Sequence, residues 1–152
     1  MSSPGERLRE LGLALPSVAV PAGAYVPARR AASLVFTAGQ LPFVDGTLPA
    51  TGKVGADVEP DEAYELARLC ALNALAAVDG LVGLDAVVGV VKVVGFVASA
   101  PGFTGQPGVV NGASELLGAV FGEAGRHARS AVGVAELPMG SPVEVELVVE
   151  LA

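Results

Sequence analysis

Apolar side chains recur along the chain with two periods, one typical of helices and the other typical of strands. Within 4–13 and 60–78 they return at steps of three and four, which is the spacing of an amphipathic helix. Within 142–151 they alternate with polar side chains, as in a strand with one covered face. The segment 86–99 is a nearly continuous apolar run rich in valine, which favours an interior strand.

Glycine and proline set the boundaries of these segments and complete the predicted order. In sequence, the predicted elements are a helix at 4–13, an extended linker at 16–23, strands at 25–31 and 33–38, a helix at 60–78, a strand at 86–99, a helix at 109–121, a strand within 126–138 and a strand at 142–151. The first two strands form a hairpin, and Asp79-Gly80 ends the longer helix. The last two strands are predicted to form a tight hairpin through Met139-Gly140, which pairs Arg129 with a residue near Glu150.

These elements make an α+β fold in which two main helices cover one face of a sheet. No long helix remains for the other face, so another subunit is expected to cover it. The composition agrees, because 52% of the residues are hydrophobic and the mean hydropathy is +0.60. The competing explanation is a membrane span, but the longest candidate, 81–100, is interrupted by Asp85 and Lys92. We therefore expect one domain over 1–152 that forms a soluble oligomer.

Charge and rare residues exclude several classes of protein. The net charge is −7 and the pI about 4.6, whereas a nucleic-acid binder usually has a basic face. One cysteine and one histidine provide neither an internal disulfide nor a multi-cysteine or histidine-rich metal site. Cys70 lies on the apolar stripe of its helix and Asn73 at its margin, and both are expected to be structural. The sequence has no P-loop, no Rossmann glycine fingerprint, no Gly-x-Ser-x-Gly elbow and no signal peptide, so a cytoplasmic location is expected.

The stretch 126–138 places two arginines and the only histidine within four residues, at the entrance of a strand. Strand alternation puts Arg129 on one face with Ala131 and Gly133, which are small enough to leave room at the guanidinium. An arginine in such a place suits bidentate binding of a carboxylate. The alternative is a salt bridge from Arg129 to one of the sixteen acidic residues, at an interface or at the surface, and exposed pairs contribute little.

Glu144 lies on the polar face of the last strand, where a glutamate can position a water and move protons beside a substrate. The alternative is a solvated strand face shared with Glu146 and Glu150. In a tight hairpin, Glu144 would lie on the order of 20 Å from Arg129. The hairpin register is then offset, or a site that uses both residues draws on more than one chain.

Three other residues are candidates with two interpretations each. Tyr25 follows a flexible segment and is either a ligand clamp or a half-buried strand residue. Asn111 lies near a helix start and is either a local cap or a site residue. Gln40 follows Gly39 and is either a strand-end contact with solvent or a ligand donor.

Taken together, the motifs in these segments resemble the Rid family, the reactive intermediate deaminases that are also called the YjgF family. The resemblance covers nearly everything from Tyr25 to the C-terminus. The N-terminal helix and linker at 1–23 resemble a longer branch of the family. The motifs that carry the resemblance are Ala24-Tyr25-Val26, Phe36-Thr37-Ala38-Gly39-Gln40-Leu41-Pro42, Val109-Val110-Asn111, Ala128-Arg129-Ser130-Ala131-Val132, Leu137-Pro138 and Val143-Glu144-Val145-Glu146.

The resemblance implies a chorismate-mutase-like fold and a homotrimer, in which three sheets form a central barrel with ligand clefts between subunits. It implies a hydrolase that converts small 2-imino or enamine acids, such as 2-iminobutanoate and 2-iminopropanoate, to 2-oxo acids and ammonia. No metal or organic cofactor is implied, and neither nucleic acid nor membrane is an expected partner. By the same resemblance, Arg129 binds the substrate carboxylate and Glu144 orients water or handles protons. The further cleft residues that it implies are Tyr25, Gly39, Gln40, Asn111 and Ala131.

Two other functions stay open. One is a non-catalytic trimer that binds small anions or acts like a chaperone. The other is an endoribonuclease of the kind often attached to the family name (L-PSP), against which the net charge of −7 counts. Many deaminating members have cysteine where this chain has Ala131, a difference that removes a thiol and keeps the backbone carbonyl.

Overall fold

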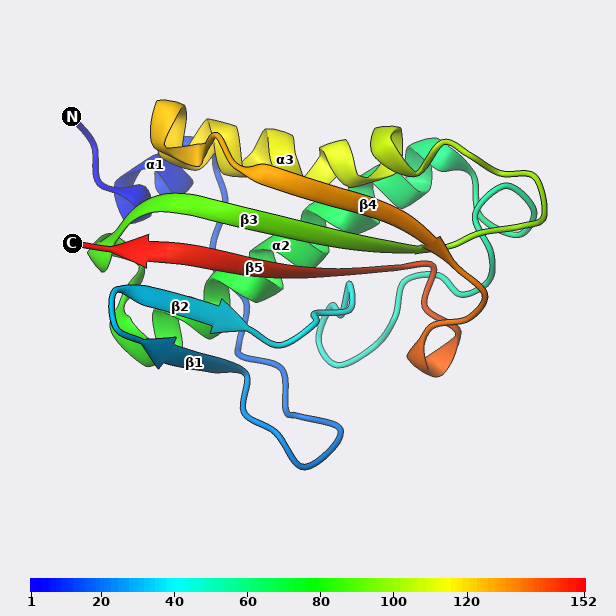
Figure 1. Cartoon of the computed structure of the whole chain (residues 1–152), viewed down its shortest axis with the longest axis horizontal. Coiled ribbons are helices and arrows are strands. Elements are labelled where there is room, and N and C mark those ends of the chain that lie inside the picture. Colours follow the sequence, from blue (N-terminus) through cyan, green and yellow to red (C-terminus); the bar gives the residue numbers. More distant parts are fainter.

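The computed structural model describes residues Met1 to Ala152 and has two layers, a five-stranded sheet and helices packed on one of its faces (Figure 1). The elements are α1 (Pro4–Glu10), β1 (Ala28–Ala31), β2 (Leu34–Thr37), α2 (Pro60–Val82), η1 (Leu84–Ala86), β3 (Val87–Ala98), α3 (Gln106–Phe121), η2 (Gly122–Gly125), β4 (Ala128–Val134), η3 (Pro138–Gly140) and β5 (Val143–Leu151). The predicted α+β fold, with two main helices on one face and a short N-terminal helix, is confirmed.

The sheet has the strand order β1-β2-β5-β3-β4. The first hairpin is confirmed, because β1 and β2 pair in antiparallel register. The predicted hairpin between the last two strands is wrong, since β3 lies between them, parallel to β4 and antiparallel to β5. Arg129 therefore lies beside Val93 and not beside a residue near Glu150. β5 has a strand on either side and a fully buried apolar face, whereas β4, at the edge of the sheet, has no buried residue.

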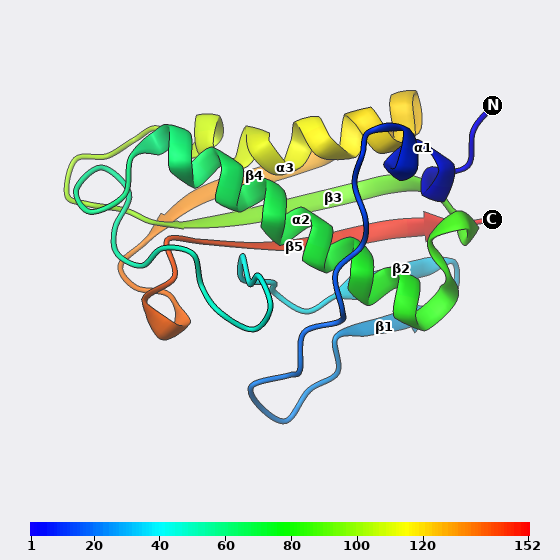
Figure 2. The same cartoon turned by 180° about the vertical axis from the view of Figure 1, so that it is seen from behind.

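The boundaries of α2 and α3 differ from the predicted ones. α2 continues for two residues beyond Asp79-Gly80 and ends at Val82, with Gly83, at a φ of 81°, as its C-cap. The glycine at position 80 has a packing role, because a Cβ there would lie 3.2 Å from Cγ2 of Val18 in the linker. Figure 2 shows this linker crossing the outer side of α2. α3 begins at Gln106, three residues before the predicted start, with Pro107 in its first turn.

The core lies between the sheet and the two long helices, which Figure 2 shows in front of the strands. Cys70 is fully buried, and burial raises the pKa of its thiol well above the ordinary value. Asn73 Nδ2 donates hydrogen bonds to the carbonyl oxygens of Leu41 and Phe43, at 2.9 and 3.1 Å. Both residues are structural, as predicted, and Asn73 fixes the segment that follows β2.

The opposite sheet face, in front in Figure 1, is not covered by any helix. We call it the open face. Its exposed apolar side chains are Phe36, Val88, Val91 and Val132. No helix in the structure combines the length and the apolar character that a membrane span requires. The expectation that this chain leaves one sheet face uncovered is confirmed.

Candidate functional site

The residues predicted for the site fall in two separate places. Arg129, Asn111 and Ala131 lie where α3 packs on the edge strand β4. The other four residues line one separate cavity, and they are Tyr25, Gly39, Gln40 and Glu144. We call the first place the arginine site and the second the glutamate cavity.

The Arg129 guanidinium is held by three hydrogen bonds to α3. Its Nη1 donates to Oδ1 of Asn111 at 2.8 Å and to Oγ of Ser114 at 3.2 Å, and its Nη2 donates to the carbonyl oxygen of Pro107 at 3.2 Å. A guanidinium has five N–H donors. Nε–H and one N–H of Nη2 therefore have no partner in the chain. Nε and Nη2 form the edge of a guanidinium that can bind both oxygens of a carboxylate.

The charge of Arg129 is not neutralised within the chain. Arg129 is partly buried, and all three of its acceptors are neutral groups. The salt bridges of the structure join Arg7 to Glu10, Lys53 to Glu136 and Arg126 to Glu123. The surface salt-bridge interpretation of Arg129 is therefore wrong, whereas a salt bridge at a subunit interface stays open. The guanidinium is a partly desolvated cation that an anion would stabilise.

Local sequence explains how Arg129 reaches α3. In the parallel register, Arg129 lies beside the buried Val93, and Ala131 lies beside Gly95. These positions share one face, as strand alternation predicted, and α3 covers this face. A Cβ at Gly95 would collide with the side chain of Val110, so the glycine lets α3 lie close to the sheet. The close approach brings Asn111, next to Val110 in α3, to the guanidinium.

The glutamate cavity has a volume of about 120 Å³ and includes the half-buried carboxyl of Glu144. Burial raises the pKa of this carboxyl above its ordinary value, and the nearby Glu146 adds to the rise. Gly39 lies against it, since a Cβ at this position would be 2.8 Å from Cδ of Glu144. Glu144 thus differs from Glu150, which is exposed on the same strand face. A half-buried carboxyl with a raised pKa is suited to proton transfer.

Tyr25 and Gln40 have different roles at this cavity. Tyr25 is half-exposed, and its hydroxyl oxygen accepts a hydrogen bond from the backbone N–H of Ala22 at 3.1 Å. The linker residues 19–22 thereby form one wall of the cavity. Gln40 is buried, forms two backbone hydrogen bonds with Val145, and donates from its amide to Ala38 O at 3.4 Å. Its strand-end position is confirmed, but its side chain serves the backbone and is not in contact with solvent.

The sheet keeps the arginine site and the glutamate cavity apart within one chain. Arg129 is level with Val93 of β3, whereas Glu144 is level with Phe96. This difference of three residues is about 10 Å along the strands, in addition to about 10 Å across them. Because the difference is odd, Arg129 and Glu144 also leave the sheet on opposite faces. One protomer does not bring both side chains to one small ligand.

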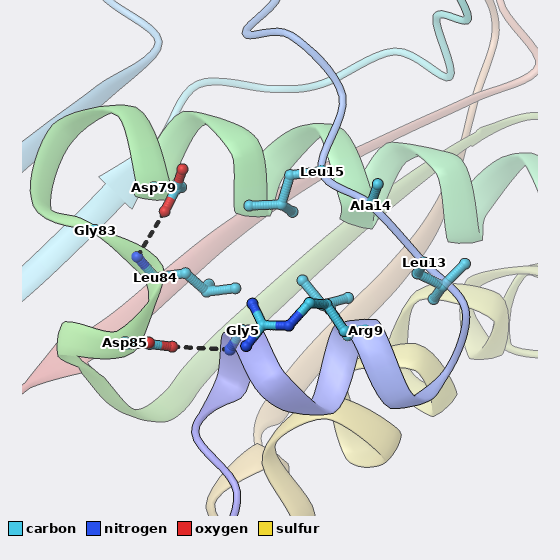
Figure 3. Close-up of a pocket in the computed structure, with 10 residues that line it drawn as sticks. Gly5, Arg9, Leu13, Ala14, Leu15, Asp79, Gly83, Leu84 and Asp85 are labelled. Atoms are coloured by element: carbon cyan, nitrogen blue, oxygen red, sulfur yellow. Dashed lines mark hydrogen bonds between the residues drawn. The ribbon is translucent and has the colours of Figure 1, made fainter.

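A larger hollow, of about 390 Å³, lies between α1 and the end of α2 (Figure 3). Asp79 and Asp85 line it, but both carboxylates already accept backbone hydrogen bonds, from Leu84 at 2.9 Å and from Gly5 at 2.8 Å. No predicted site residue contributes to it, and we interpret it as part of the contact that holds α1 against η1 and the end of α2. No three His, Cys, Asp or Glu side chains of the structure converge as metal ligands would.

Two further residues belong to the arginine site: Ser114, which the sequence patterns did not identify, and His127, which they marked only as a member of the cluster at 126–129. Ser114 lies one helical turn after Asn111, and its hydroxyl oxygen is 2.9 Å from Nε2 of His127. The i, i+3 spacing from Asn111 in α3 could have indicated Ser114, and the i, i+2 spacing from Arg129 could have indicated that His127 shares its face. Met139, with a φ of 60°, also lines the glutamate cavity, and no sequence signal marks it.

Comparison with known proteins gives consistent matches over the whole chain. The model of the family described as "YjgF/chorismate_mutase-like, putative endoribonuclease" matches residues 5–151. Protein TCP17 of Trypanosoma cruzi is 47% identical over 146 residues, which cover 95% of this chain and 91% of that protein. The crystal structure of Atu1372 from Agrobacterium tumefaciens, a protein with unknown function, is 44% identical with a TM-score of 0.90, covering 98% of this chain and 92% of that chain. Escherichia coli TdcF, crystallised with bound serine, is 25% identical with a TM-score of 0.65, covering 91% and 94%.

Proposed function

The chain belongs to the YjgF/chorismate mutase-like family, and on this premise we propose that it hydrolyses small 2-imino acids, or their enamine tautomers, to 2-oxo acids and ammonia. The observation that carries this proposal is the charge of Arg129, which is partly buried and bonded only to neutral groups. A substrate carboxylate would supply the missing negative charge and accept the two remaining N–H donors. TdcF, a relative, binds serine, and serine carries such a carboxylate.

Glu144 is assigned the proton transfers of the reaction. Water adds to the carbon of the C=N bond, the nitrogen takes up protons, and the C–N bond then breaks to release ammonia. A carboxylate beside the substrate can accept a proton from the water and return it to the nitrogen. The raised pKa of Glu144 supports this role, because a carboxyl that titrates closer to neutral pH can both accept and donate.

The proposed site needs two subunits, because the sheet separates Arg129 from Glu144. β4 has a free edge, and the open face carries exposed apolar side chains. We place the β4 edge of one subunit against the open face of the next, in a closed homotrimer. Asn111 and Ala131 then belong to the arginine half of each site, and Tyr25 and Gly39 to the glutamate half.

The assay that tests the proposed activity generates 2-iminopropanoate or 2-iminobutanoate in situ with an amino-acid oxidase and follows 2-oxo acid release. Wild type should accelerate release, and Arg129→Ala should lose about 100-fold in kcat/KM because a bidentate charged contact is lost. Arg126→Ala is the matched control, since Arg126 is exposed and pairs with Glu123 at the surface. It should behave as wild type.

The same preparations separate the other two functions. A wild type that gives no acceleration with any of several amino acids would refute the deaminase. Binding of 2-oxobutanoate that Arg129→Ala abolishes, without turnover by wild type, would establish a binding module instead. Purified protein should leave RNA intact, as its net charge of −7 leads us to expect.

A further inference from the structure

Behind Arg129, a chain of hydrogen bonds leads away from the ligand-facing edge of the guanidinium. Nη1 of Arg129 donates to Oγ of Ser114 at 3.2 Å. The same oxygen is 2.9 Å from Nε2 of His127, and Nδ1 of His127 is 2.7 Å from the carbonyl oxygen of Gly125. The chain therefore links an edge strand, the middle of α3 and the end of η2.

Chemistry fixes the direction of each bond. A carbonyl oxygen only accepts, so Nδ1 of His127 carries the proton that binds Gly125. In the neutral ring, Nε2 then has a lone pair and accepts the hydrogen of the Ser114 hydroxyl. With its hydrogen directed to His127, the Ser114 oxygen presents only lone pairs to Arg129. In this arrangement the Nη1 hydrogens of Arg129, the Ser114 hydroxyl hydrogen and the Nδ1 hydrogen of His127 all have acceptors.

The arrangement matters because a serine hydroxyl is otherwise free to rotate. Ser114 could also donate to a helix carbonyl and turn its lone pairs away from the guanidinium. His127 removes this freedom by accepting the hydroxyl hydrogen. Asn111 accepts from the same nitrogen of Arg129 at 2.8 Å, so both hydrogens of Nη1 are bound. Binding at Nη1 leaves the Nε–Nη2 edge for a ligand.

We propose that Ser114 and His127 are positioning residues, which orient Arg129 so that its Nε–Nη2 edge meets the substrate carboxylate. This inference rests on the proposed function, because it assumes that Arg129 binds a carboxylate. Neither residue contacts the substrate. His127 acts through Ser114, and Ser114 acts through Arg129.

Because His127 acts on Arg129 only through Ser114, a double-mutant cycle has a specific expected outcome. Ser114→Ala should weaken binding of 2-oxobutanoate and raise KM by about tenfold, the effect of one hydrogen bond to a charged group. His127→Ala should give a smaller effect in the same direction. The double variant should be no worse than Ser114→Ala, because the histidine has no other route to Arg129. The value of kcat should change less than KM.

Two further variants sharpen the cycle. His127→Gln keeps an acceptor oxygen for the Ser114 hydroxyl and should recover most of the binding lost in His127→Ala. Arg126→Ala, next to the histidine, should bind as wild type. Additive losses in the double variant, or wild-type KM and affinity in Ser114→Ala, would overturn the proposal while leaving the deaminase intact.

A second measurement does not depend on activity. The protein has one histidine, so imidazole nitrogen signals in an NMR spectrum belong to His127 and only Nδ1 and Nε2 need to be distinguished. The neutral ring should be the Nδ1–H tautomer, and Ser114→Ala should shift the Nε2 signal more than the Nδ1 signal. An Nε2–H tautomer in wild type would overturn the hydrogen-bond chain, whatever the kinetic result. A wild type with this tautomer but without turnover or ligand binding would refute the deaminase, and with it the positioning role.

Discussion

Glu144 has an environment with a direct consequence for pH dependence. Its carboxyl is half-buried, and burial together with Glu146 raises its pKa. Gly39 contributes to this environment, because the missing Cβ lets backbone lie where a side chain would touch the carboxylate. If Glu144 must be ionised to accept a proton from water, the activity follows its titration.

The acid limb of the kcat/KM profile is therefore expected above the ordinary glutamate pKa of about 4.3. Glu144→Gln should lower kcat by about 100-fold or more and remove this limb, since the amide cannot accept the proton. Steady-state kinetics from acid to neutral pH would check both points. A limb that persists unchanged in Glu144→Gln would assign the titration to another group.

Stability should depend on pH through the same residue. The folded-state pKa of Glu144 lies above the unfolded-state value, so the wild type loses stability as pH rises through the raised pKa. Glu144→Gln does not ionise and is expected to be the more stable protein at neutral pH. In urea denaturation the difference between the two proteins should vanish below the unfolded pKa. A difference that is independent of pH would contradict the raised pKa.

Alternation along the strand was enough to place Arg129 and Ala131 on one face, but not to show that α3 covers this face. Ser114 and His127 carry no motif, and only the packing of α3 on β4 makes them neighbours. The distance between Arg129 and Glu144 was predicted from a wrong strand pairing, because alternation shows which face a residue occupies and not which strand lies beside it. The partner of a strand depends on contacts between segments far apart in sequence.

At the scale of elements, the contact between α2 and α3 determines where the arginine site forms. Gly112 of α3 has no room for a side chain, since a Cβ there would overlap the carbonyl oxygen of Tyr64 in α2. Asn111 and Ser114 lie on either side of this contact in sequence. A glycine at this point lets α3 approach α2 closely while its other side reaches Arg129.

Gly112→Ala should destabilise the fold by about 2–4 kcal/mol, because backbone and not a flexible side chain blocks the added methyl. Gly118→Ala, in the same helix, is the matched control. A Cβ at Gly118 meets nothing within 4 Å, and this variant should gain up to about 1 kcal/mol from helix propensity. Urea denaturation measures both. Equal stability of the two variants would show that the helices do not cross as closely as described.

Helical periodicity located α2, but Gly80 was a misleading stop signal, because the glycine makes room for Val18 of a distant segment. Strict alternation located β5 in the same way, without revealing that β3 and not β4 lies beside it. In both cases the local pattern gave the type of element, and packing by another segment decided its boundary or its neighbour.

At the scale of the whole molecule, the open face is the surface that calls for a partner. Val91 and Val132 of this face are 41% and 43% exposed, although both lie in strands. An apolar surface on a sheet is a common feature of subunit interfaces. The proposed trimer covers it and completes the site at the same time.

Val91→Glu should prevent assembly, because burying a charge at an apolar interface is costly. The variant should remain folded, have the mass of a monomer in light scattering and lose deaminase activity. Leu81→Glu is the control, since Leu81 is 46% exposed but lies near the end of α2, in the helix layer and not on the open face. It should assemble and react as wild type. A Val91→Glu protein that stays oligomeric would locate the interface elsewhere.

The most direct test of a site shared between subunits is complementation between two inactive variants. Arg129→Ala and Glu144→Gln, each inactive alone, would be co-expressed with different tags, and the mixed oligomers purified through both tags. In a site shared between neighbours, some interfaces combine an intact Arg129 with an intact Glu144. Every mixed trimer has such a site at one of its three interfaces, so roughly a third of wild-type activity should return. Mixed oligomers as inactive as the parent variants would contradict a site built from two chains.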